Sequence, residues 1–133
     1  MADITCQMRS NYFRVRSAAG FRRFCRRYAL IVFNNTERGK NRRFGFLADE
    51  RIPKGRIARN GDWIETDFMG ELAKHLARGE VAVVMEIGHE KMRYLVGYAS
   101  AVSWKGERIQ VALSDIYRRA KETFGVEPTV AEY

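Results

Sequence analysis

The stretch from residue 80 to residue 113 constrains the fold most, because its pattern predicts three strands joined by two short turns. The predicted strands cover residues 80–87, 93–104 and 108–113. The two turns are Gly88-His89-Glu90-Lys91 and Lys105-Gly106, and both are too short to connect parallel strands. The chain therefore has to build a sheet that is mainly antiparallel.

The rest of the sequence predicts three further strands and three helices. We expect strands over residues 11–16, 29–33 and 42–48, the second of them fully buried. One helix is expected over residues 17–28, and another follows residue 62 and ends at about residue 78. A last helix follows Ser114 and ends at Gly125, since serine caps helix starts and glycine ends helices. We expect its apolar side chains to face inward: Ile116, Tyr117, Ala120 and Phe124.

These elements predict an α+β fold in the order β-α-β-β-α-β-β-β-α, with a mainly antiparallel sheet and helices packed on one face. The 133 residues contain no internal repeat and no linker, so we expect a single domain over residues 1–133. Residues 49–62 place Pro53, Gly55 and Gly61 among basic side chains, which predicts a mobile basic loop. Residues 126–133 form a short irregular tail.

The helix expected over residues 17–28 has two chemically opposite faces. Its apolar stripe, at helical spacing, is Phe21, Phe24, Cys25 and Tyr28. The opposite face is made of Arg22, Arg23, Arg26 and Arg27. Like charges four residues apart repel each other by roughly a few tenths of a kcal/mol, so a bound anion would offset this repulsion.

The net charge of +8 is unevenly distributed along the chain. Residues 1–60 hold 15 basic side chains, 13 of them arginine, against 4 acidic ones, whereas residues 61–133 hold 9 basic and 12 acidic side chains. Such asymmetry indicates a polyanionic partner, and arginine forks onto phosphate better than lysine does. The candidate anion-binding residues are Arg14, Arg16, Arg22, Arg23, Arg26, Arg27, Arg38, Lys40, Arg42, Arg43, Arg51, Lys54, Arg56 and Arg59. The alternative is that these arginines only solvate a surface.

The string Arg42-Arg43-Phe44-Gly45-Phe46-Leu47 resembles the aromatic submotif on the third strand of RNA-recognition-motif domains. The resemblance implies that Phe44 and Phe46 stack on bases, that Arg42 meets phosphate, and that Tyr12 is a companion platform. The alternative, which we favour, places Phe44 and Phe46 in the core under the helices.

A protein-binding site is expected at the hairpin of residues 88–94, whose polar cluster would otherwise be a solvated tip. Next to it, one strand face carries Tyr94, Val96, Tyr98, Val102 and Trp104. If that face is open, it suits homodimer pairing; we favour its burial in the core.

No enzymatic motif is present, so we expect neither catalysis nor a cofactor nor a bound metal. His75, His89, Glu86 and Cys25 are the residues that a metal or acid–base site would use, but a half-buried His75 and an exposed turn at His89 are the ordinary alternatives. Cys6 and Cys25 match neither a disulfide framework nor a zinc site.

No apolar run is long enough for a membrane span, and the sequence opens without a secretory leader, so we expect a cytoplasmic protein that does not bind membranes. The predicted function is non-catalytic binding of nucleic acid or a nucleoprotein, mainly through phosphates. The main alternative is a small inhibitor or adaptor that binds a host protein machine, such as an anti-defence protein of a mobile element. An unrecognised hydrolase or transferase is a third, minor alternative.

Overall fold

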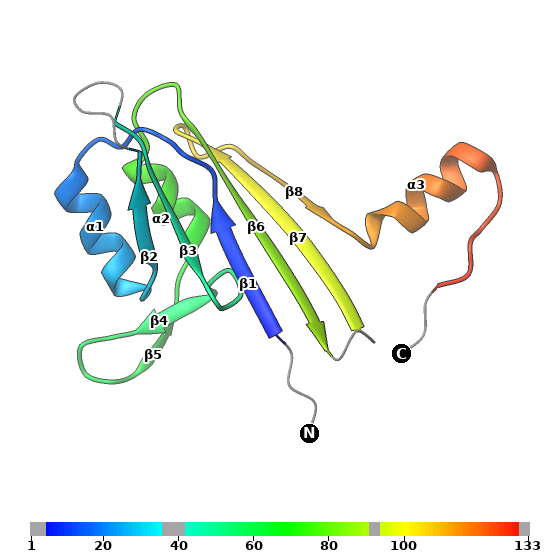
Figure 1. The fold of residues 1–133 in the computed structure, drawn as a ribbon, viewed down its shortest axis with the longest axis horizontal. Helices are drawn as coiled ribbons and strands as arrows, with labels where there is room; N and C mark the ends of the chain where they lie inside the picture. The colour runs from blue at the N-terminus through cyan, green and yellow to red at the C-terminus, as the bar shows by residue number, and fades with distance from the viewer. Residues whose placement is uncertain (1–4, 36–41, 91–93, 131–133) are drawn as a thin grey trace.

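The computed structural model describes residues 5–35, 42–90 and 94–130 (Figure 1). The strands are β1 (Thr5–Ser10), β2 (Ile31–Asn34), β3 (Phe44–Ala48), β4 (Gly55–Ile57), β5 (Trp63–Glu65), β6 (Val81–Glu90), β7 (Tyr94–Ser103) and β8 (Arg108–Ala112). The helices are α1 (Ala18–Arg27), α2 (Phe68–His75) and α3 (Asp115–Phe124). Within these residues, six strands form one antiparallel sheet in the order β2-β3-β1-β6-β7-β8. The α+β class and the antiparallel sheet are therefore confirmed.

The three strands β6, β7 and β8 form the meander that the sequence predicts. Met85 of β6 pairs with Ala99 of β7, which in turn pairs with Val111 of β8. Strand β6 is longer than predicted, because its pairing continues to Glu90 opposite Tyr94. The turn predicted over 88–91 is therefore wrong in position, and residues 91–93 lie outside the described residues.

The first strand of the sheet is β1, and the strand predicted over residues 11–16 is wrong. β1 lies at the centre of the sheet, between β3 and β6. Residues 11–16 instead connect β1 to α1, and only Phe13 and Val15 form single bridges, to Phe44 and Leu76. The alternation of Phe13 and Val15 is real, but each residue pairs with a different element and no continuous ladder forms.

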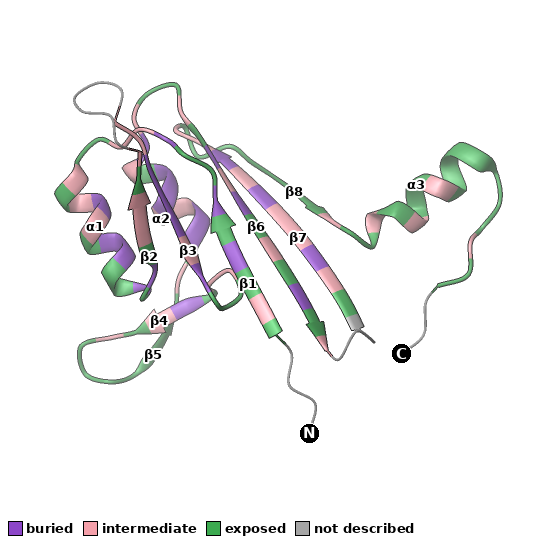
Figure 2. Ribbon diagram, viewed as in Figure 1, coloured by how far each residue is buried: buried purple, intermediate pink, exposed green. Residues whose placement is uncertain are grey.

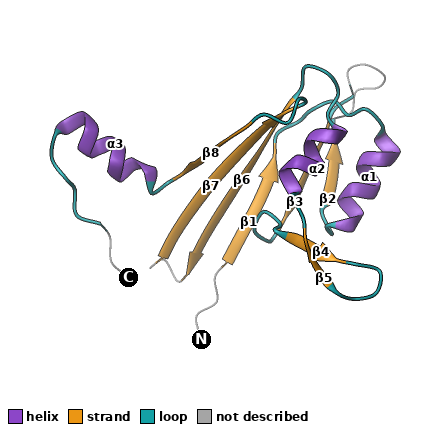
Figure 3. Ribbon diagram, turned by 180° about the vertical axis from the view of Figure 1, so that it is seen from behind, coloured by secondary structure: helices purple, strands orange, loops and turns teal. Residues whose placement is uncertain are grey.

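The core lies between one face of the sheet, here called the inner face, and the helices α1 and α2 (Figures 2 and 3). Aromatic rings fill it. The Phe24 ring stacks on Phe68 with centroids 5.4 Å apart, and Phe46 meets the same Phe68 edge-on at 5.8 Å. Such pairs add stability beyond the apolar area that they bury. The apolar stripe predicted for residues 17–28 is confirmed, since Phe21, Phe24, Cys25 and Tyr28 are all buried.

Two predicted segments near the edge of the sheet differ in detail. The strand expected to be fully buried is β2, which pairs only with β3 and forms an edge, so Ile31 is exposed. The segment 49–62, expected to be an irregular loop, contains β4, which pairs with β5 from Gly55↔Glu65 to Ile57↔Trp63. This hairpin lies below α1 and α2 in Figure 1.

Helix α3 packs on neither face of the sheet, which corrects the prediction that its apolar side chains face inward. It projects beyond the end of β8 (Figure 1). None of its ten residues, all of them described, is buried, and Ile116 and Phe124 are 63% and 75% exposed. Its predicted end at Gly125 is confirmed, because Gly125 adopts φ 72°, a left-handed conformation that favours glycine.

Candidate anion-binding surface

Helix α1 positions the arginines, and its two ends are closed by local hydrogen bonds. The Ser17 hydroxyl accepts a hydrogen bond from the amide of Gly20 at 3.1 Å, which confirms the predicted N-cap. At the other end, the amide of Leu30 donates to the carbonyl of Cys25 at 2.9 Å, and Ala29 adopts φ 55°. The helix is thus fixed in register, with its apolar stripe on the core and its arginines outward.

The four arginines of α1 cover the face opposite the core. Arg23, Arg26 and Arg27 are exposed and Arg22 is half-buried. None of the four makes an ion pair with another described residue. Arg26 and Arg27 lie in the last turn, where the helix dipole favours positive charge. Their charge is therefore available to an external anion.

Two further arginines extend this face. The guanidinium groups of Arg22 and Arg42 lie 5.3 Å and 5.0 Å from the centroid of the same Phe44 ring, so the start of β3 meets α1 here. On the α2 side, Arg16 donates from Nε to the carbonyl of Leu76 at 2.8 Å. We use the name arginine surface for Arg16, Arg22, Arg23, Arg26, Arg27 and Arg42.

The pKa of His75, at the end of α2, responds to the positive charge of this surface. Its ring lies 4.9 Å from that of Phe24, where it is half-buried. Burial lowers the pKa of His75 most, and the nearby charges of Arg27, Arg23 and Arg16 lower it further, against an opposing effect of Glu71. Three arginines from α1 and the preceding segment therefore converge near one imidazole.

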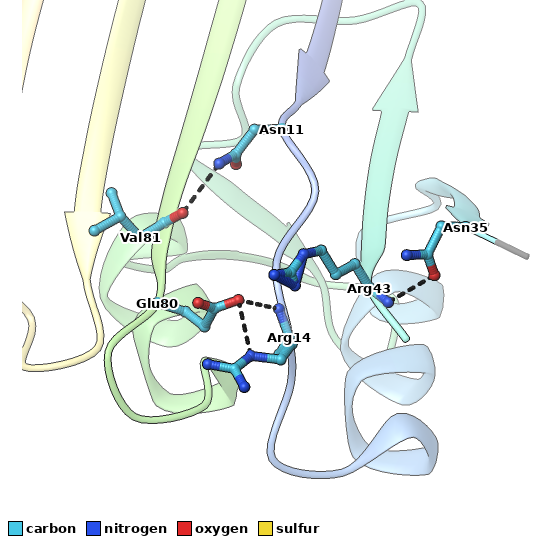
Figure 4. Close-up of polar contacts among 6 residues, drawn as sticks. All are labelled: Asn11, Arg14, Asn35, Arg43, Glu80 and Val81. Atoms are coloured by element: carbon cyan, nitrogen blue, oxygen red, sulfur yellow. Dashed lines mark hydrogen bonds and ion pairs between the residues drawn. The ribbon is translucent and has the colours of Figure 1, made fainter. Parts of the chain in front are cut away.

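Arg14 does not join the arginine surface, because the acidic half of the chain neutralises it. The Nε of Arg14 lies 3.4 Å from the carboxylate of Glu80 (Figure 4). The same carboxylate also accepts a hydrogen bond of 2.7 Å from the backbone amide of Arg14. Arg43 is held in the same region, where its backbone amide donates to Asn35 at 2.8 Å. Its buried Nη1 has no hydrogen-bond partner among the described residues.

The other basic residues predicted to bind anions, where they are described, lie at two separate sites away from the arginine surface. Arg56 and Arg59 lie on or next to the β4–β5 hairpin, and Arg56 is close enough to the C-cap residue Tyr28 to affect its pKa. Burial, together with a hydrogen bond from its hydroxyl to Glu71, raises the pKa of Tyr28 to about 12. Arg51 and Lys54 instead line a groove on the other side of α2. Arg38 and Lys40 lie outside the described residues.

The groove beside α2 is a feature that the sequence did not predict. It has a volume of about 680 Å³ and lies between residues 51–54, the start of α2 and the strands β6 to β8. Arg108 crosses it to bind Asp67 through two hydrogen bonds of 2.8 Å and 2.7 Å, which lower the pKa of Asp67. Asp67 thereby neutralises Arg108, so this arginine does not extend the arginine surface.

The aromatic residues expected to stack on bases differ in how far they are buried. Phe44 and Phe46 are 2% and 0% exposed, so the stacking role is wrong for both and the core alternative is confirmed. Tyr12 is exposed, and its ring meets Phe33 edge-on at 5.1 Å. Of the face predicted along residues 94–104, Val96, Tyr98 and Val102 lie on the inner side, where Val102 is buried while Val96 and Tyr98 line the groove.

The residues weighed for metal or acid–base chemistry are separated. His89 and Glu86 are an odd number of positions apart on β6, so they lie on opposite faces of the sheet. Cys25 is buried in α1, where burial raises its pKa to about 12. In the described parts of the chain, no three metal-ligating side chains lie together.

Comparisons with models of protein families, with curated proteins and with solved structures gave no match. Among the described residues, no helix has the length and apolar character needed to cross a membrane. The arrangement of charge on the fold is therefore the basis for a functional proposal.

Proposed function

We propose that this protein binds nucleic acid through its arginine surface, mainly by contacts to phosphates. The observation that carries the proposal is the face of α1, where four arginines lie together without an ion pair among the described residues. Their mutual repulsion destabilises the free protein slightly, and a phosphate backbone offsets it. Arginine also matches phosphate with two parallel hydrogen bonds.

A nucleic acid suits this surface better than an isolated acidic group does. Arg22, Arg23, Arg26 and Arg27 follow one another along the helix, so an extended row of charges can engage all of them at once. Each neutralised phosphate releases counterions, which favours a polymer of high charge density. The loss of the stacking role for Phe44 and Phe46 leaves backbone contacts as the main mode of binding.

The test is a fluorescence anisotropy titration of labelled double-stranded DNA, single-stranded DNA and RNA at several salt concentrations. We expect the logarithm of affinity to fall linearly with the logarithm of salt concentration, with a slope of about −4 for four to six phosphate contacts. Arg23→Glu with Arg26→Glu should weaken binding by about tenfold or more and reduce the slope by about 2. Both side chains are exposed, so the fold should be kept.

The matched control is Arg118→Glu with Arg119→Glu, which changes the net charge equally on the distant α3 (Figure 1). Because charges farther apart than about 10 Å are largely screened, this variant should bind within about twofold of the wild type. An equal loss in both variants would show that only net charge matters. Absence of binding at low salt, with stoichiometric co-purification of an acidic protein, would assign the surface to a protein partner.

A further inference from the structure

The face of the sheet opposite α1 and α2, here called the outer face, exposes many large apolar side chains. They include Val81, Met85, Ile87, Leu95, Ile109, Val111 and Leu113. Figures 1 and 3 show none of the described helices across this face, and Figure 2 shows exposed and half-buried residues alternating with buried ones along β6 and β7. Contiguous apolar surface of this kind on a folded chain marks an interaction site.

The side chains of the outer face are arranged to accept a helix. Between Leu95 and Ser103, the middle strand β7 carries only small side chains there, namely Gly97, Ala99 and Ala101, and the Leu113 side chain lies over Gly97. Larger side chains flank this row on β6 and β8, since Met85 and Val111 are the register partners of Ala99 on its two sides. The two flanking strands are about 10 Å apart, which is about the diameter of an α-helix with its side chains.

Helix α3 is the described element with the complementary shape and chemistry. Ile116, Ala120 and Phe124 recur every four residues and form one apolar stripe, while Arg118 and Glu122 lie on the opposite side. The ten residues of α3 span about 15 Å, close to the roughly 16 Å covered by five residues of a strand. None of these α3 residues is buried within its own chain.

The junction between β8 and α3 directs the helix away from its own sheet. The amide of Leu113 donates to the carbonyl of Gly97 at 3.0 Å, and the Asp115 carboxylate accepts from the amide of Ala112 at 2.8 Å. The amides of Ile116 and Tyr117 then continue the hydrogen bonding at 3.1 Å and 3.3 Å. With two residues between β8 and α3, these bonds set the helix axis, and Figure 1 shows it pointing outward.

The total exposed area also has the size expected for a subunit of an oligomer. A compact monomer of 15.4 kDa exposes about 7,200 Å². This chain exposes 9654 Å², about 2,500 Å² more. A stable interface buries about 800 Å² on each partner, and obligate homodimers bury more. The excess is therefore sufficient for a dimer.

We propose that the protein forms a symmetric homodimer in which each α3 lies along β7 on the outer face of the partner. Ile116, Ala120 and Phe124 contact the partner's row of small residues and the larger side chains that flank it. The contact is reciprocal, as two-fold symmetry requires. The arginine surface lies on the other side of the sheet and takes no part in the contact, so this proposal goes beyond nucleic-acid binding.

The test is sedimentation velocity of the full chain without nucleic acid, over a range of protein concentrations. We expect the wild type to sediment as a dimer. Ile116→Asp with Phe124→Asp should sediment as a monomer, and so should Met85→Glu with Val111→Glu. The matched control, Arg118→Ala with Glu122→Ala, changes the polar side of the same helix and should remain a dimer. Circular dichroism checks that each variant keeps the fold.

Mixing the two monomeric variants distinguishes exchange of α3 from direct stacking of the two outer faces. The α3 variant keeps an intact outer face and the outer-face variant keeps an intact α3, so one of the two reciprocal contacts is restored. We expect the mixture to form a heterodimer, about tenfold or more weaker than the wild-type dimer. A monomeric wild type, or an α3 variant that still dimerises, would overturn the proposal and leave nucleic-acid binding untouched.

Discussion

At the scale of single residues, His75 is the most direct probe of the arginine surface. Burial and the charges of Arg27, Arg23 and Arg16 keep its pKa below the ordinary value of 6.5. Removing one of those charges by Arg27→Gln should raise the pKa of His75, because a nearby positive charge disfavours the protonated imidazole. A nuclear magnetic resonance titration of the imidazole measures this.

Nucleic acid should raise the same pKa, because bound phosphates offset the arginine charges. If the pKa of His75 moves neither with Arg27→Gln nor with added nucleic acid, the anion does not bind beside α1.

At the scale of secondary-structure elements, the end of α1 contains a residue in an unfavourable conformation. Ala29 has φ 55°, a left-handed conformation that costs a residue with a β-carbon about 1–2 kcal/mol. Glycine adopts it readily, but loses more chain entropy on folding. Ala29→Gly should therefore raise the free energy of unfolding by about 0.5–1 kcal/mol, as measured by urea denaturation.

The matched control for this variant is Ala19→Gly, within the same helix. Ala19 is exposed and has ordinary helical geometry, so glycine there should lower the free energy of unfolding by about 0.5–1 kcal/mol. If both variants lose stability, the left-handed turn at Ala29 does not determine how α1 ends.

The elements that the sequence predicts best are those with a strong local signal. The apolar spacing and Ser17 define α1, and the turn at Lys105-Gly106 fixes β7 against β8. Strand β1 has no such signal: its inward residues are Cys6, Met8 and Ser10, and its pairing partners lie far away in the sequence. Tertiary contacts, which no local pattern contains, determine that it is a strand.

Alternation along a strand defines two faces but does not tell which one is covered. Val81 and Met85 are more apolar than Ala82 and Glu86, yet they lie on the outer face because α2 packs against the other side. The apolar stripe of α3 likewise does not tell which surface covers it. The direction of the chain after β8 keeps α3 away from its own core. Whether the partner of an apolar face is the same chain or another molecule cannot be read from its periodicity.

At the scale of the whole molecule, alkaline pH should lower stability through two buried groups. Burial raises the pKa of Cys25 from 9.0 to about 12, so the unfolded chain loses this proton at a lower pH than the folded chain does. Burial likewise raises the pKa of Tyr28 from 10.0 to about 12, so its hydroxyl also loses its proton at a lower pH in the unfolded chain. The free energy of unfolding should therefore fall as pH rises from about 9 toward 12, as measured by urea denaturation.

Cys25→Ala should remove much of the decline that begins near pH 9, whereas Cys6→Ala, at a partly exposed site, should leave it unchanged. A decline that is equally steep in all three proteins would exclude the buried thiol as its cause.

The distribution of charge over the molecule is only partly contained in the sequence. The excess of arginine before residue 60 is visible in the chain, and α1 keeps four of these arginines on one face. Folding brings Arg16 and Arg42 to the same surface but separates Arg14 and Lys54 from it, since Glu80 neutralises Arg14 and the path of the chain takes Lys54 to the groove beside α2. Distance along the sequence does not determine distance in space.

The central place of β1 affects how the protein is made. A nascent chain exposes Thr5–Ser10 before its partner strand β6, which is translated only when residues 81–90 are reached. Until then, β1 can pair with β3 through Met8 and Arg9 only. Synthesis must therefore reach residues 81–90 before β1 acquires both neighbours, and deletion of Thr5–Ser10 would divide the sheet in two.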